Sequence, residues 1–106
     1  MRSVNVRLSE LSNVTIPIGF VGENAYTRVI FDCKKIYEDY PSAIAGLSVE
    51  PPTGDAYPAV VEKDGTDVVW DIDDSDVVYD GYGAIQLTFT VDEMVAKSYL
   101  GKIFIR

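Results

Sequence analysis

Histidine is absent from this sequence of 106 residues, and cysteine occurs once, at Cys33. Without histidine the chain lacks the usual general base, the commonest zinc ligand and the partner that activates a serine or cysteine nucleophile. A single cysteine cannot form a disulfide within the chain. Because Cys33 alternates with Val29 and Phe31, we expect a small buried hydrophobic residue there and not a reactive thiol. With no nucleophile motif either, we predict that the protein is not an enzyme and uses no cofactor.

Positive charge is also scarce, because nine Lys and Arg stand against seventeen Asp and Glu, which gives a net charge of −8. Nucleic acid binding draws most of its affinity from cations that neutralise phosphates, so we exclude nucleic acid as a partner. Long apolar runs are missing too. None approaches the roughly 20 residues that span a bilayer, and the N-terminus lacks the continuous apolar stretch of a signal peptide. We therefore expect no membrane partner.

The chain has the length and the apolar content of one globular domain, residues 1–106, with apolar residues making up 47%. Residues 3–8 alternate polar and apolar side chains and predict a first strand. Chain termini are ordered only when other parts of the protein hold them, so residues 1–10 are also a candidate N-terminal arm.

Period-two alternation continues along most of the chain, as expected for half-buried strands. Pro17 cannot donate to a strand ladder, so its strand is predicted to lie at a sheet edge or to face solvent there. Asp64-Gly65 is a strong hairpin signal, and Gly101 is a candidate bulge in the last strand. Seven or eight strands at this spacing indicate an all-β fold, an antiparallel β-sandwich. The expected strands are residues 3–8, 14–20, 25–34, 46–50, 59–63, 67–72, 84–91 and 94–106.

An acidic segment, DDSDVVYDG, separates the Trp70 strand from the Ala84 strand. Its carboxylates and the terminal Gly81 predict a single helical turn, with Tyr79 packing that turn onto the core. Asp71, Asp73 and Asp76 are candidate calcium ligands. The spacing lacks the glycine and the glutamate of an EF-hand loop, so we interpret these carboxylates as helix caps and predict no metal. An irregular calcium site is the alternative.

Seven tyrosines are the main candidates for binding. Tyrosine is enriched at interfaces because it combines a large rigid surface with a polar tip. Tyr37, Tyr40 and Tyr57 fall in predicted loops and are expected to be exposed. The Tyr40-Pro41 step excludes a long helix between residues 35 and 45 but leaves room for a short helical turn. Ile30, an apolar residue on the polar side of its strand, indicates contact with a partner.

A series of short motifs runs from Phe31-Asp32 to Ser98. It comprises a Tyr-Pro loop, a proline-rich loop before Tyr57-Pro58, and the sequences DGTDVVWDI, DDSDVVYDGYG and MVAKS. This series resembles the N-terminal immunoglobulin-like domain of the baseplate upper protein (BppU) family, found in tails and baseplates of phages and prophages of Gram-positive bacteria. The matching features are the Gly65-Thr66 turn, the Trp70 strand, the turn from Asp76 to Gly83 and the closing strand with Ala96-Lys97-Ser98. The resemblance covers roughly residues 14–106.

The resemblance implies an immunoglobulin-like sandwich that serves as a structural module of the virion, without enzymatic activity or cofactor. Such a module is made in the bacterial cytoplasm and docks on other phage tail proteins, and a homo-oligomer would arise from the assembly. The alternative function is a carbohydrate-binding module that recognises host cell-wall glycan, because exposed tyrosines also stack on sugar rings. On either reading the interaction residues are predicted to be Ile30, Tyr37, Tyr40 and Tyr57.

Overall fold

A four-stranded sheet forms one layer of the protein in the computed structural model, which describes residues 1–23 and 27–106. Its third and fourth strands are joined by a hairpin at Gly65, whose φ of 62° suits glycine at the predicted Asp64-Gly65 turn. Its first strand pairs in parallel with the second. In spatial order the strands are β1 (Arg2–Arg7), β3 (Thr27–Asp32), β7 (Asp67–Asp71) and β6 (Glu62–Asp64).

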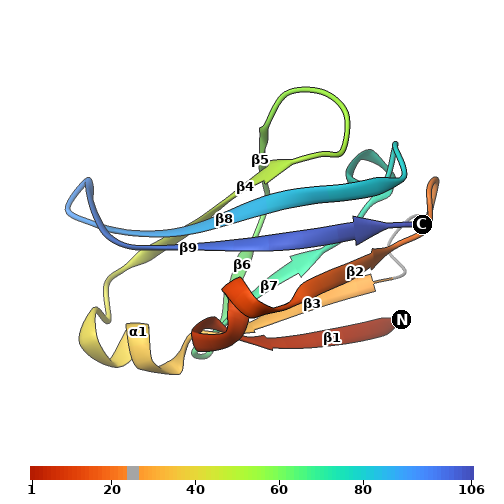
Figure 1. The fold of residues 1–106 in the computed structure, drawn as a ribbon. Helices are drawn as coiled ribbons and strands as arrows, with labels where there is room; N and C mark the ends of the chain where they lie inside the picture. The colour runs from red at the N-terminus through yellow and green to blue at the C-terminus, as the bar shows by residue number, and fades with distance from the viewer. Residues whose placement is uncertain (24–26) are drawn as a thin grey trace.

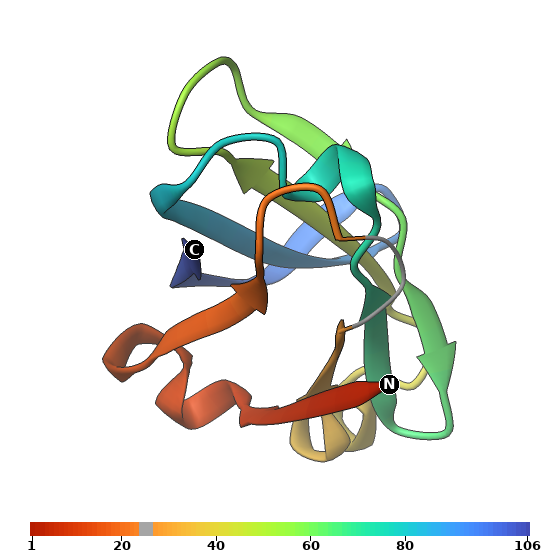
Figure 2. The same cartoon turned by 90° about the vertical axis from the view of Figure 1, so that its right-hand side faces the viewer.

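A five-stranded sheet forms the second layer (Figures 1 and 2). Its two longest strands make a hairpin around Asp92 and Glu93, both with positive φ, and this hairpin extends beyond the rest of the sandwich in Figure 1. The sheet begins with a parallel edge strand that contains Pro17, as predicted. In spatial order the strands are β2 (Thr15–Gly19), β9 (Met94–Ile105), β8 (Gly81–Val91), β4 (Ile44–Glu50) and β5 (Tyr57–Ala59).

Three short helical segments close the ends of the sandwich: η1 (Leu8–Asn13), α1 (Lys34–Asp39) and η2 (Asp74–Asp76). Because β3 and β7 are antiparallel neighbours, α1, which follows β3, and η2, which follows β7, lie at opposite ends of the molecule (Figure 1). Segment α1 stops before Tyr40-Pro41, as the sequence predicted. Within the described residues no helix combines the length and the apolar character needed to cross a membrane.

The core lies between the sheets and follows the predicted alternation. Trp70, Phe31 and Phe89 are the largest of the fully buried side chains. Burying a large apolar side chain contributes about 1.5–3 kcal/mol, so these alternating rows account for the two-layer packing. The predicted β-sandwich is thus confirmed. Other core residues, from both sheets, are Ile16, Ile18, Val29, Leu47, Val49, Val68, Ile85, Leu87, Ile103 and Ile105.

Both sheets are mixed, whereas the sequence suggested antiparallel pairing throughout. The chain reverses direction at η1, so β1 and β2 run in opposite directions, one in each layer. There β1 pairs in parallel with β3, and β2 pairs in parallel with β9. Residues 2–7 are therefore an edge strand paired along its length, and the predicted arm does not project from the fold. Val6, which is buried, holds this strand to the core.

The predicted strand at residues 59–63 is wrong, because the chain changes layers there. Tyr57–Ala59 pairs with β4, whereas Glu62–Asp64 pairs with β7 in the other sheet. The predicted strand at 25–34 is described only from Thr27, so its first two positions, Ala25 and Tyr26, lie outside the described residues.

Gly101 does not form the predicted bulge. The register of the β8–β9 pair shifts between Phe89 and Thr90. A Cβ atom on Gly101 would lie 2.8 Å from Cδ1 of Leu11, a fully buried side chain of η1. Glycine therefore lets η1 pack directly on β9.

Candidate functional site

The acidic turn between β7 and β8 is organised by a capping box. The side chain of Asp73 accepts a hydrogen bond from the Ser75 backbone N–H at 2.9 Å, and the Asp73 N–H donates to Asp76 Oδ2 at 3.0 Å. Each bond satisfies a backbone donor that a helix terminus leaves free. The predicted capping role of these carboxylates is confirmed. Val77, fully buried, packs the turn onto the core, whereas Tyr79 is 51% exposed, so the prediction for Tyr79 is wrong.

Asp71, the third candidate calcium ligand, points to a different partner. The Arg28 guanidinium donates from Nε to Asp71 Oδ1 at 2.6 Å and from Nη2 to Oδ2 at 3.2 Å across β3 and β7. This hydrogen bond raises the pKa of Arg28. The prediction that Asp71 caps the helical turn is therefore wrong, whereas Asp73 and Asp76 belong to the same capping box. Within residues 1–23 and 27–106, no cluster of three or more acidic, histidine or cysteine side chains is placed to hold a metal ion.

Tyr37 is buried, so the prediction that it is exposed is wrong. Helix α1 turns the ring inward, where it is only 6% exposed and meets Phe89 edge to face with 5.7 Å between ring centroids. The Lys63 ammonium lies 4.7 Å from the centroid of the same ring. Burial raises the pKa of Tyr37, whose hydroxyl has no hydrogen-bond partner among the described residues.

The remaining predicted interaction residues do not form one site. The prediction that Tyr57 is an exposed loop residue is wrong, because it is half-buried on β5 and its hydroxyl donates to Asp76 Oδ1 at 2.7 Å. Tyr40 is exposed just after α1. Ile30 is half-buried on the outer face of the four-stranded sheet, level with Asn5 and Val69. Tyr40 and Ile30 remain candidates, but they come from different parts of the fold.

The outer face of the five-stranded sheet carries a group of apolar side chains that the sequence analysis missed. We call Pro17, Tyr82, Leu100 and Phe104 the outer patch. Tyr82 pairs across the ladder with Phe104, and Phe104 pairs with Pro17 on the next strand. The two aromatic ring centroids lie 4.8 Å apart, tilted by 39°. Tyr82 is 71% exposed and Leu100 is 66% exposed, so apolar side chains on this face meet solvent on both sides of Lys102.

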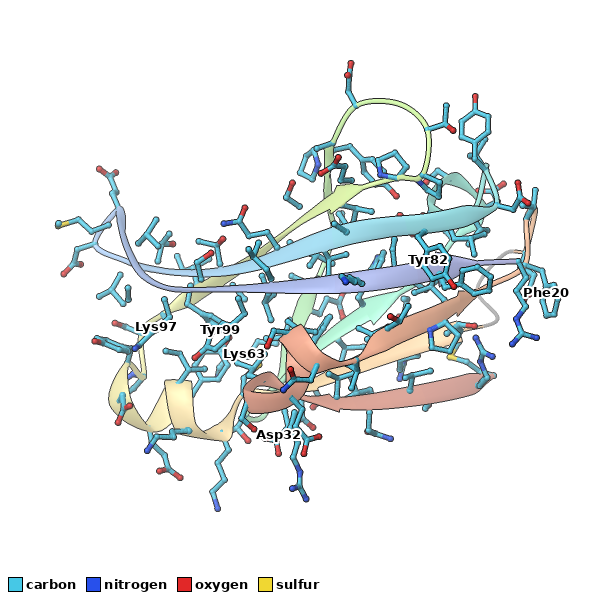
Figure 3. The ribbon with its side chains drawn as sticks, viewed as in Figure 1. Phe20, Asp32, Lys63, Tyr82, Lys97 and Tyr99 are labelled. Carbon is cyan, nitrogen blue, oxygen red and sulfur yellow. The ribbon has the colours of Figure 1, made fainter. Side chains whose placement is uncertain are left out.

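Polar side chains border the outer patch on the same face. Gln86, opposite Leu100, donates from Nε2 to Ser98 Oγ at 2.7 Å, and exposed Lys102 lies between Leu100 and Phe104 on β9. Figure 3 shows Tyr82 in front of β8 and β9, near the end where β8 begins. An apolar centre with a polar border is the composition of many protein interfaces. Alternation in the sequence could have revealed these residues. Leu100 and Phe104 are apolar residues at positions of their strand that face solvent, as Ile30 is in its own strand.

A groove of about 540 Å³ opens at the other end of the molecule, between η1, α1 and β9. Four side chains with positive charge line it, and we call it the basic groove: Arg7, Lys34, Lys35 and Lys97. Tyr99, half-buried, supplies part of its apolar lining. In Figure 3, Lys97 and Tyr99 lie on the side of β9 that faces α1.

The comparisons with known proteins concern the fold. No family model and no curated protein matches the chain. Among solved structures, the chain is similar to the cysteine protease inhibitor EhICP2 from Entamoeba histolytica. The TM-score is 0.55 and the identity is 12%, over 100% of this chain and 97% of that one. The chain therefore adopts an immunoglobulin-like β-sandwich, as the sequence predicted, and at this identity the likeness extends to the fold alone.

Proposed function

We propose that this chain is a non-enzymatic structural module of a phage or prophage tail, which docks on other tail proteins at the baseplate. The observation that carries the proposal is the outer patch. Exposed aromatic and apolar side chains grouped on one sheet face, with polar side chains among and around them, suit a protein partner. The occupant we expect is an apolar surface of a neighbouring tail protein, seated over Tyr82, Leu100 and Phe104.

The motif resemblance supports the same proposal. Its matched residues occupy positions that serve the fold: the Gly65 turn, the buried Trp70 and the β8–β9 register shift beside Lys97. A module whose distinctive residues build the sandwich, and which exposes Tyr82 and Leu100 on the outer face of one sheet, is suited to assembly. Its site of action is the virion, after synthesis in the bacterial cytoplasm.

The test is to induce the strain that encodes the chain, purify the particles and analyse their proteins by mass spectrometry. We expect the chain in the particles in a fixed ratio to other tail proteins. Leu100→Glu in the outer patch should reduce incorporation, whereas Val60→Glu, at a position 82% exposed between β5 and β6, should not. Absence of the wild-type chain from the particles, while it accumulates free in the lysate, would overturn the proposal.

Glycan binding is the second candidate function, and the Tyr82–Phe104 pair favours it more than the loop tyrosines do. Exposed aromatic rings on a flat sheet can stack on sugar rings, with Gln86 and Ser98 beside them as hydrogen-bonding groups. Titration with fragments of host cell wall separates the two candidates. A saturable signal that Tyr82→Ala abolishes, with Tyr40→Ala as the comparison variant, would support glycan binding through the patch.

A further inference from the structure

The distribution of charge is uneven in a way that the proposed function leaves unexplained. Of the nine Lys and Arg in the chain, four line the basic groove, although the protein as a whole has a net charge of −8. Across the described residues, the one ion pair within 4.0 Å is Arg28–Asp71, which lies outside this groove. The groove therefore presents exposed cations to solvent in a strongly acidic protein.

The geometry of β9 explains why apolar side chains line the groove beside these cations. Lys97 and Tyr99 lie on the same face of β9 as Ile103 and Ile105, whose side chains point into the core. Towards the β8–β9 hairpin this face leaves the cover of the four-stranded sheet and meets α1 and the start of η1 (Figure 1). The groove thus offers apolar surface from Tyr99 and half-buried Leu8 between its cations.

The groove also contains three carboxylates, and they restrict what can occupy it. Asp32, Glu38 and Asp39 line it together with the four cations, so the formal charge of the lining is 4 − 3 = +1. Asp32 Oδ1 already accepts a hydrogen bond from the Lys34 backbone N–H at 3.2 Å. A net charge of only +1 neutralises little of the dense negative charge of a polyphosphate or a nucleic acid, so the lining favours a ligand that carries few negative charges. A protein segment with a few carboxylates and an apolar side chain matches the lining better.

The opposite end of the same chain offers such a segment. The turn around η2 exposes Asp73, Asp74 and Asp80, with half-exposed Val78 and Tyr79 between them. We call these five residues the acidic corner. They present negative and apolar groups from one short stretch of chain. The negative groups complement the positive charge of the groove, and the apolar side chains match its apolar lining.

We propose that the acidic corner of one copy of the chain occupies the basic groove of the next. Because groove and corner lie at opposite ends of the molecule, the contact is heterologous, and repetition produces a head-to-tail ring or filament. This inference rests on the proposed function in one respect, since an assembled tail is where such copies would be brought together. It leaves the outer patch of each copy free for another protein.

Charge reversal tests the contact directly. Lys34→Glu with Lys97→Glu changes the groove, and Asp74→Lys with Asp80→Lys changes the corner. All four positions are exposed, so we expect both variants to fold. In analytical ultracentrifugation over a concentration series, wild type should associate, and each variant should associate on the order of tenfold more weakly or worse. An equimolar mixture of the two variants should recover association, because each reversed groove then meets a reversed corner.

Two matched substitutions serve as controls. Lys102→Glu changes an exposed lysine on β9 outside the groove, and Asp55→Lys changes an exposed aspartate outside the corner. Both should associate as wild type does. A wild-type chain that stays monomeric at every concentration, or association that survives reversal of the groove, would overturn the inference. Mass spectrometry of particles reports separately on the tail function, so either proposal can fail while the other stands.

Discussion

The Tyr57 hydroxyl donates a hydrogen bond of 2.7 Å to Oδ1 of Asp76, a carboxylate that is almost fully buried. The other oxygen, Oδ2, accepts from the Asp73 N–H. One side chain thus joins β5, at the edge of the five-stranded sheet, to the turn that follows β7 in the other sheet. Burial raises the pKa of Tyr57, and the hydrogen bond to Asp76 raises it further, so the phenol remains the donor at neutral pH.

Tyr57→Phe should destabilise the protein by about 1–2 kcal/mol. The substitution keeps the ring but removes a hydrogen bond to a buried carboxylate, which then lacks one of its partners. Urea unfolding followed by Trp70 fluorescence measures the change, since Trp70 is the single tryptophan. A midpoint equal to that of wild type would show that the bond contributes nothing.

Tyr37→Phe is the matched control, and we expect the opposite sign. The Tyr37 hydroxyl is buried without a partner among the described residues, so its removal relieves a desolvation cost. The expected result is no loss of stability and a gain of up to about 1 kcal/mol. If both Tyr→Phe variants lost the same stability, the loss in Tyr57→Phe could not be attributed to its hydrogen bond with Asp76.

Asp76→Asn should reveal a pH-dependent contribution of the buried carboxylate. Burial raises the pKa of Asp76 above its ordinary value of about 3.9, against the opposing effect of its hydrogen bonds. The folded state therefore binds this proton more tightly than the unfolded state. The resulting stability is fully present below the unfolded-state pKa and is lost as the pH rises through the folded-state pKa.

The measurement for Asp76 is the free energy of unfolding of wild type and of Asp76→Asn over a pH series. Comparing the two proteins at each pH cancels the titration of the other carboxylates. We expect the advantage of wild type to shrink as the pH rises above about 4. An advantage that grows with pH would mean that hydrogen bonding, and not burial, dominates the pKa of this group.

Local alternation was enough to predict most of the core. Phe31, Cys33 and Trp70 were assigned inward positions correctly, because the side chains of a strand alternate between its faces whichever strand lies beside it. The capping carboxylates and the Asp64-Gly65 turn were equally local signals. The gap between the predicted strands 84–91 and 94–106 also coincides with the observed turn at Asp92 and Glu93.

Features that depend on which segments meet could not be predicted in this way. The switch from β5 to β6 between the layers leaves no periodic signal, since both strands are three residues long. Tyr37 is buried because α1 turns it onto Phe89, a residue far along the chain. The outer patch needs the register that places Tyr82 beside Phe104, and the basic groove needs α1 to meet β9.

Cys33 should be unreactive while the protein is folded. It is 1% exposed, and burial raises the pKa of its thiol from an ordinary value of 9.0 to about 12. At neutral pH this lowers the reactive thiolate fraction by roughly a thousandfold. Labelling with a thiol reagent should be slow in buffer and rapid in concentrated urea. Fast stoichiometric labelling of the folded protein would show that the thiol reaches solvent.

Gly83→Ala and Gly46→Ala form a matched pair on two neighbouring strands, β8 and β4. A Cβ atom on Gly83 would lie 2.5 Å from the backbone oxygen of Glu50, on the β4 strand, whereas a Cβ on Gly46 would meet nothing within 4 Å. Neither glycine has a positive φ, so the substitutions differ in space and not in backbone strain.

Gly83→Ala should therefore cost about 1–3 kcal/mol, because a strand backbone cannot move aside as a flexible side chain can. Gly46→Ala should be neutral or slightly stabilising, since alanine loses less conformational freedom on folding than glycine does. Thermal and urea unfolding of both variants measure the two effects. If both variants lost the same stability, a general effect of alanine on strands would explain the result, and a steric clash at Gly83 would not. If Gly83→Ala kept wild-type stability, β4 and β8 would have to lie farther apart than in the structure.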